Sequence, residues 1–130
     1  MADAVTSQTI VDTEKRVVMK FTNLSDGNGE AAVKKVDVSA LTAHPDGTAC
    51  SQVTIDQIWY DVGGMRVLID FDASTNVAAL VLGGSAAAGN VHGHMDFRSF
   101  GGIKNNASSP TGDLDFTTSG HTNLDHYTVI

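Results

Sequence analysis

The stretch VTIDQIWYDVGGMRVLIDF, residues Val53–Phe71, decides the fold. In its second half, apolar residues occupy every other position: Met65, Val67, Ile69 and Phe71. A period of two is typical of a strand with one buried face. The Gly63-Gly64 pair separates this run from a second apolar and aromatic run. The stretch therefore predicts a central β-hairpin.

The first half of the stretch changes parity. Val53 and Ile55 share one face of an ideal strand, whereas Ile58, Tyr60 and Val62 fall on the other. Either a bulge near Gln57 re-aims the side chains, or the strand is covered on both faces. Because Trp59 lies within the strongest strand, we expect it to be buried rather than to serve as a platform for a ligand.

Outside this stretch, helix signals are nearly absent, and Gly, Asn-Gly and Asp-Gly steps interrupt the chain at short intervals. This pattern favours an all-β fold, an antiparallel β-sandwich or a jelly-roll-like barrel with long Gly-rich loops. We expect a flexible N-terminal arm over residues 1–7 and a single domain over residues 8–130. Further strands are expected at Gln8–Asp12, Arg16–Leu24, Glu30–Val38, Val77–Leu82, His94–Phe97, Asp113–Thr118 and Tyr127–Ile130.

Several connections carry their own expectations. The Ser25–Gly29 turn predicts a second hairpin, and the six apolar residues of Val77–Leu82 indicate a strand buried on both sides. Gly83–Gly93 and Arg98–Thr111 are expected to be surface loops. The apolar end at Tyr127–Ile130 indicates either a final strand that pairs centrally or a native chain that continues beyond Ile130.

Composition narrows the possible functions. The 130 residues have a mass of 13.6 kDa and a formal net charge of −7, and the eight Lys and Arg residues are scattered. This charge argues against direct binding to nucleic acid. The sequence shows neither an apolar run long enough for a membrane helix nor a secretory signal, which indicates a protein made in the cytoplasm. Cys50, the single cysteine, is expected in the core.

Candidate catalytic and metal-binding patterns are incomplete. His92 and His94 share a strand face, as metal ligands require, but the spacing does not supply a third ligand. Asp26, Asn28 and Glu30 resemble the opening of a calcium loop whose remaining ligands are missing, so a plain turn is favoured. The two acidic pairs are expected on solvated sheet faces; they are Asp70 with Asp72, and Asp113 with Asp115. We therefore expect no enzyme activity and no cofactor.

The order of short motifs from Arg16 onward resembles a family of small virion structural proteins of tailed, especially marine, phages. The motifs are Phe21-Thr22-Asn23-Leu24-Ser25-Asp26-Gly27, Val36-Asp37-Val38-Ser39, Val53-Thr54-Ile55, Ile58-Trp59-Tyr60, Asp96-Phe97-Arg98, Gly101-Gly102-Ile103, Asn105-Asn106, Thr111-Gly112-Asp113, Thr117-Thr118, Gly120-His121 and Tyr127-Thr128-Val129-Ile130.

The resemblance implies a protein of the virion that binds the major capsid protein or other virion proteins. Capsid decoration, in which small subunits bridge capsid proteins, is the first expectation. The expected assembly is a homo-oligomer, specifically a trimer. A neck or tail adaptor and a carbohydrate- or receptor-binding β-sandwich are the alternatives. The contact residues are expected in the N-terminal arm and the Arg98–Thr111 loop, at Arg98, Phe100, Ile103, Lys104, Asn105 and Asn106.

Overall fold

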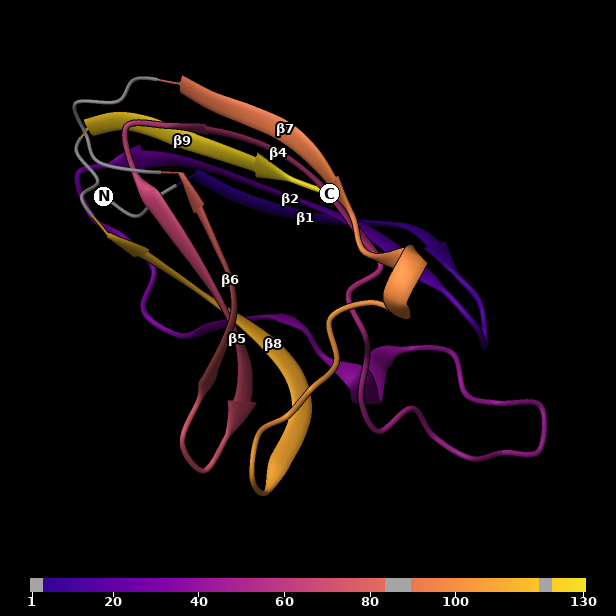
Figure 1. Ribbon diagram of the computed structural model, residues 1–130. Coiled ribbons are helices and arrows are strands. Elements are labelled where there is room, and N and C mark those ends of the chain that lie inside the picture. Colours follow the sequence, from indigo (N-terminus) through magenta and orange to yellow (C-terminus); the bar gives the residue numbers. More distant parts are fainter. Residues whose placement is uncertain (1–3, 84–89, 120–122) are drawn as a thin grey trace.

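The computed structural model describes residues 4–83, 90–119 and 123–130, and these form two antiparallel β-sheets packed as a sandwich (Figure 1). The five-stranded sheet has the order β1-β2-β9-β4-β7, and the four-stranded sheet has the order β3-β8-β5-β6. The strands are β1 (Ala4–Asp12), β2 (Val17–Asp26), β3 (Val33–Val36), β4 (Gln57–Gly63), β5 (Arg66–Ala73), β6 (Val77–Gly83), β7 (Asn90–Asp96), β8 (Pro110–Ser119) and β9 (Asn123–Val129). Two short 3-10 helices are η1 (Val38–Ala40) and η3 (Arg98–Phe100).

The core lies between the sheets and follows the alternation of the sequence. Met65, Val67, Ile69 and Phe71 are each no more than 2% exposed, which confirms the buried face predicted for the second half of the central stretch. The rings of Phe21 and Tyr127, from the larger sheet, pack against Phe116 of the smaller sheet with centroid distances of 5.2 and 5.8 Å. Each of these three side chains is at most 5% exposed.

The central stretch does not form a hairpin, and this prediction is wrong. β4 pairs with β9 and β7 in the larger sheet, whereas β5 pairs with β8 and β6 in the smaller one. The connection carries the chain from one sheet to the other through Gly64, whose φ is +79°. A side chain at Gly64 would also overlap the carboxylate of Asp125. The buried faces of β4 and β5 therefore face each other across the core.

The predicted Ser25–Gly29 hairpin is wrong for the same reason. β2 belongs to the larger sheet, and β3, which follows this turn, pairs with β8 in the smaller sheet. The turn itself forms as expected: Gly27 has a φ of +106°, and the Ser25 hydroxyl donates to the Asn28 carbonyl at 2.7 Å. Turn-forming residues thus fix the reversal of the chain but not the sheet to which the next strand belongs.

The parity change before β4 has a different origin from either alternative. β4 begins at Gln57, and Ile55 forms an isolated bridge with Ile103. Val53, Ile55, Ile58 and Tyr60 all contact the core. The strand is interrupted at Asp56, and this interruption turns the side chains of Ile58 and Tyr60 to the same side as those of Val53 and Ile55. Trp59 is 43% exposed, which shows that β4 is not covered on both faces and that the expected burial of Trp59 is wrong.

For two further strands, either the predicted burial or the predicted first residue is wrong. Val77–Leu82 lies in β6, but β6 is an edge strand and Val81 is 54% exposed, so it is not buried on both sides. The first strand begins at Ala4 rather than Gln8, which places residues 4–7 of the expected arm in a ladder with β2. The final strand, β9, is central in its sheet, as predicted.

The expected loop Gly83–Gly93 is only partly described. Residues 84–89 lie outside the described residues, and Asn90 already begins β7. Among the described residues, no helix has the length and apolar character needed to span a membrane.

Candidate functional site

One end of the sandwich holds an open cavity of about 850 Å³. The far ends of β1 and β2, the connection between them and the long segment 41–56 surround it, and Figure 1 shows this segment extending away from both sheets. Apolar side chains that contact the core line part of it, among them Met19, Leu41 and Val53. Cys50 also lines the cavity; it is half-buried in the loop, so its expected place in the core is wrong.

Charged groups also line this cavity. Arg98, at the start of η3, is exposed and forms an ion pair with Asp96, with 2.7 Å between Nη2 and Oδ2. Hydrogen bonds from the Arg98 guanidinium and backbone N–H lower the pKa of Asp96 to about 2. Because this pair is exposed, it orients Arg98 more than it stabilises the fold.

The six predicted contact residues have different surroundings. Arg98, Phe100, Lys104 and Asn106 are exposed, and Phe100 is 63% exposed. Ile103 is instead bonded to Ile55 and packs against the core. Asn105 is half-buried, and its side-chain oxygen accepts from the N–H of Ala107 at 3.0 Å. The exposed members remain candidates for a partner contact, whereas Ile103 and Asn105 hold the loop in place.

The outer face of the larger sheet presents an aromatic pair that the sequence did not indicate. Trp59 of β4 and His94 of β7 are directly opposite, with ring centroids 4.5 Å apart and planes 8° apart. The His94 Nε2 atom lies 3.1 Å from Gln57 Oε1, which fixes the imidazole beside the indole. Asp61 is exposed on the same face, opposite His92. Polar groups therefore flank a flat, exposed ring system.

His92 and His94 share this outer face, as their spacing predicted. Within residues 4–83, 90–119 and 123–130, no group of three or more His, Cys, Asp and Glu residues is placed to hold a metal ion. His94 instead contacts Trp59 and Gln57. The pair thus contributes to an aromatic surface.

The comparisons with family models, with curated proteins and with solved structures found no match. The chemistry of the chain must therefore be argued from its own residues.

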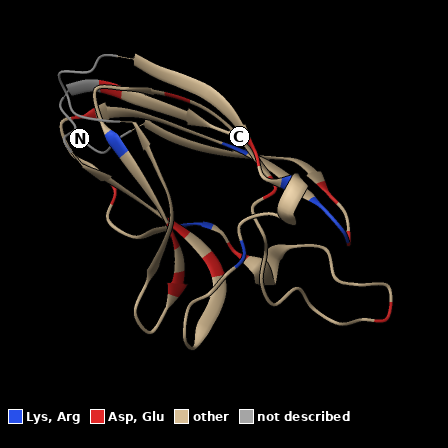
Figure 2. Cartoon of the chain, viewed as in Figure 1, with Lys and Arg blue, Asp and Glu red and all other residues tan. Residues whose placement is uncertain are grey.

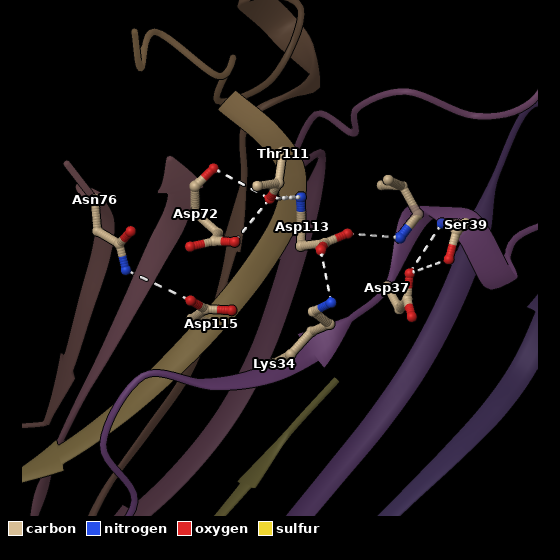
Figure 3. A network of polar contacts seen from close by, with 9 residues as sticks. Lys34, Asp37, Ser39, Asp72, Asn76, Thr111, Asp113 and Asp115 are labelled. Atoms are coloured by element: carbon tan, nitrogen blue, oxygen red, sulfur yellow. Dashed lines mark hydrogen bonds and ion pairs between the residues drawn. The ribbon is translucent and has the colours of Figure 1, made fainter. Parts of the chain in front are cut away.

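A cluster of four carboxylates lies on the outer face of the smaller sheet. Asp70 of β5 is directly opposite Asp115 of β8. Asp72 and Asp113 continue the two rows, and Figure 3 shows these two side chains with Asp115. Figure 2 shows the acidic positions on these two strands in red. Asp70, Asp113 and Asp115 are between 5% and 8% exposed, so the prediction that this face is solvated is wrong.

Neighbouring side chains and one backbone N–H form hydrogen bonds or ion pairs with three of these carboxylates. Lys34 Nζ lies 3.1 Å from Asp113 Oδ2, and the Val38 N–H donates to Asp113 Oδ1 at 2.9 Å. The Thr111 hydroxyl donates to Asp72 Oδ2 at 2.8 Å. Asn76 donates to Asp115 at 3.5 Å, a long hydrogen bond.

The least compensated carboxylate is Asp115. Burial, followed by the charge of Asp72 and a hydrogen bond with it, raises the pKa of Asp115 to about 6. Burial also raises the pKa of Asp70, while the hydrogen bond from Asn76 opposes this change. Asp115 therefore takes up a proton in mildly acidic solution, when it can donate a hydrogen bond to Asp72.

Glu30 belongs to a buried polar network rather than to a calcium loop. Its Oε1 atom accepts from Asn23 Nδ2 at 2.8 Å and from the Tyr127 hydroxyl at 2.5 Å, and its Oε2 atom lies 2.5 Å from Lys35 Nζ. The side chains of Glu30 and Lys35 are only 5% and 3% exposed. A charged pair this deeply buried joins β2, β3 and β9. This buried pair could not be inferred from the sequence, because Lys34 and Lys35 are adjacent and equally polar.

Proposed function

We propose that this protein is a non-enzymatic structural protein of a tailed-phage particle that decorates the capsid by bridging major capsid protein subunits. The resemblance to small virion proteins supplies the biological setting. The observation that carries an interaction role is the cavity of about 850 Å³ at one end of the sandwich, lined by the 41–56 segment and by residues from strands of both sheets. Apolar lining with charged groups beside it suits a segment of a protein partner.

The exposed side chains near this end support the same role. Phe100 is 63% exposed in the segment that follows Arg98, and aromatic and arginine residues commonly dominate binding at protein interfaces. The chain is acidic, which suits a location on the outer surface of a particle better than one against packaged DNA. The partner is therefore proposed to be a protein and not nucleic acid.

The experiment is to purify particles that carry this protein and to count its copies against the major capsid protein by quantitative mass spectrometry, together with cryo-electron microscopy. Copies in the hundreds support decoration. Copy numbers limited to six or twelve would move the protein to the neck or tail, and its absence from purified particles would refute the virion role.

A matched pair of variants tests the contact surface. Phe100→Asp should reduce incorporation into particles, whereas Val81→Asp should not. The side chains of Phe100 and Val81 are both large, apolar and exposed, at 63% and 54%, but Phe100 lies in η3 whereas Val81 lies on β6 of the smaller sheet. Equal incorporation of the two variants would argue against the Phe100 region as the contact.

A second candidate function is a carbohydrate- or receptor-binding module, and the exposed Trp59 ring favours it. Sugars stack on flat aromatic rings and bind adjacent polar groups, and Trp59 has Gln57 and Asp61 on the same face. Trp59 is the single tryptophan, so its fluorescence reports this face directly. A change in emission on titration with a panel of oligosaccharides, lost in His94→Ala, would support this function over the structural one.

A further inference from the structure

β1 is an edge strand that overhangs the sandwich. It is the first strand in the order of the larger sheet and pairs with β2 alone, and the larger sheet has five strands where the smaller one has four. The side chain of Val5 lies opposite Asn23, and that of Ser7 lies opposite Phe21. Asn23 and Phe21 are 2% and 5% exposed, whereas Val5 is 40% exposed. The side of β1 that continues the buried face of β2 is therefore left uncovered.

The composition of β1 is unusual for a free edge. Residues 4–11, AVTSQTIV, carry no charge and no proline, and five of the eight are Val, Ile or Thr. All residues from Ala4 to Ile10 are exposed. Monomeric proteins usually protect such edges with charges, prolines or short strands, because unpaired backbone groups otherwise pair with another strand.

The other three sheet edges differ from β1. β7 carries His92, His94 and Asp96, and β3 has only four residues, two of them Lys. β6 is uncharged, but it contacts β4 and β7 of the opposite sheet. β1 has a register shift between Thr9 and Val11, but residues 4–9 before it form a regular ladder with β2 and carry no charge. This part of β1 is therefore the least protected sheet edge of the described residues.

We propose that two copies of this chain pair through β1 in antiparallel orientation and join their larger sheets into one continuous sheet. The absence of charge favours a second copy of this chain as the occupant. Two copies with a net charge of −7 repel each other, so a surface that pairs with itself must be locally neutral, as residues 4–11 are. A partner of a different kind would more commonly be selected by complementary charge.

Symmetry fixes the geometry of this pair. A two-fold axis perpendicular to the sheet makes the two β1 strands antiparallel and places both four-stranded sheets on the same side. Centred on Ser7, the pairing sets Val5 against Thr9 of the second copy. Eight residues of edge pairing bury less than the roughly 1,200 Å² of a stable interface, so the pair should be weak, with a Kd of about 10–100 µM. The inference does not depend on the virion role.

Sedimentation equilibrium from about 1 to about 300 µM tests the pair over this range of Kd. The wild-type mass should rise from 13.6 kDa towards twice that value. Ser7→Lys/Thr9→Lys places like charges opposite one another whether the pairing is centred on Ser7 or on Gln8, and should weaken association at least about tenfold. Ser74→Lys/Thr75→Lys adds the same charge at exposed positions between β5 and β6 and should associate like the wild type.

Hydrogen exchange identifies the surface used. Backbone amides in residues 4–11 should gain protection as concentration rises, and circular dichroism should show that both double variants are folded. A wild-type monomer at all concentrations would overturn the proposal. Unchanged association of Ser7→Lys/Thr9→Lys, association without protection of β1, or a stable mass of three subunits, the expected trimer, would also overturn it.

Discussion

Replacing Asp115 with Asn should stabilise the protein at pH 8. In the folded chain, Asp115 is 5% exposed, opposite Asp70 and close to Asp72, and its pKa is about 6 instead of the usual 3.8. A raised folded-state pKa means that the folded protein holds the proton more tightly than the unfolded chain. The stabilisation from this proton is complete below the unfolded pKa of about 3.8 and is lost as the pH rises through about 6.

The size of the effect follows from the two pKa values. The difference between about 6 and 3.8 corresponds to about 3 kcal/mol of unfolding free energy between low and high pH. Part of this free energy comes from the neighbouring charges of Asp72 and Asp113 rather than from burial alone. We therefore expect Asp115→Asn to gain about 2 kcal/mol at pH 8. Asparagine imitates the protonated carboxyl, because its amide can donate to Asp72 and its oxygen can accept from Asn76.

The assay is urea unfolding of wild type and Asp115→Asn between pH 4.5 and pH 8, at protein concentrations that keep the chain monomeric. The variant should be more stable at pH 8, and the difference should shrink towards zero at pH 4.5. Asp61→Asn is the matched control, because it removes the same charge from an exposed position on the other sheet. Parallel stability curves for wild type and Asp115→Asn, or a less stable variant at pH 8, would refute the reasoning.

Three further changes test separate features of the fold. Lys35→Ala should lower the unfolding free energy by about 3–5 kcal/mol, measured by urea unfolding, because it leaves the Glu30 carboxylate buried without its cation. Gly64→Ala should cost at least about 1–2 kcal/mol, seen as a lower midpoint in thermal melts, since φ is +79° there and the new methyl group would meet Asp125. Trp59→Ala should change the melting temperature little, because the ring is 43% exposed, while removing any sugar-induced fluorescence or calorimetric signal.

The strands were predictable because alternation is a local property. Met65, just before β5, and Val67, Ile69 and Phe71 within it point to the core, as their period requires. The pairing of strands was not predictable in the same way. A Gly-Gly step reverses the chain equally well within one sheet or between two, and the deciding interaction, such as the contact of Gly64 with Asp125, joins distant parts of the sequence.

The polar sites were hidden for a related reason. A charged residue at an alternate position is normally assigned to solvent, and Asp113 and Asp115 fit that pattern. The structure packs them beside other carboxylates and amides, which removes water without supplying an apolar neighbour. Trp59 presents the opposite case, because an aromatic residue within an apolar run faces outward against His94. Burial in a sheet depends on neighbouring strands that the local sequence does not specify.

The order of strands explains why β1 is the exposed edge. Among consecutive strands of the described chain, only β1 with β2 and β5 with β6 are direct neighbours in one sheet; every other connection crosses between sheets. The connections that cross between the sheets join strands β2 through β9 into one sandwich, in which each sheet covers one face of the other. β1 is joined to this sandwich by one local hairpin, and its residues Ala4 to Ile10 are exposed. A strand held this way adds little to the core, so the uncharged residues 4–11 of its edge are better explained by pairing with a second chain than by the stability of the monomer.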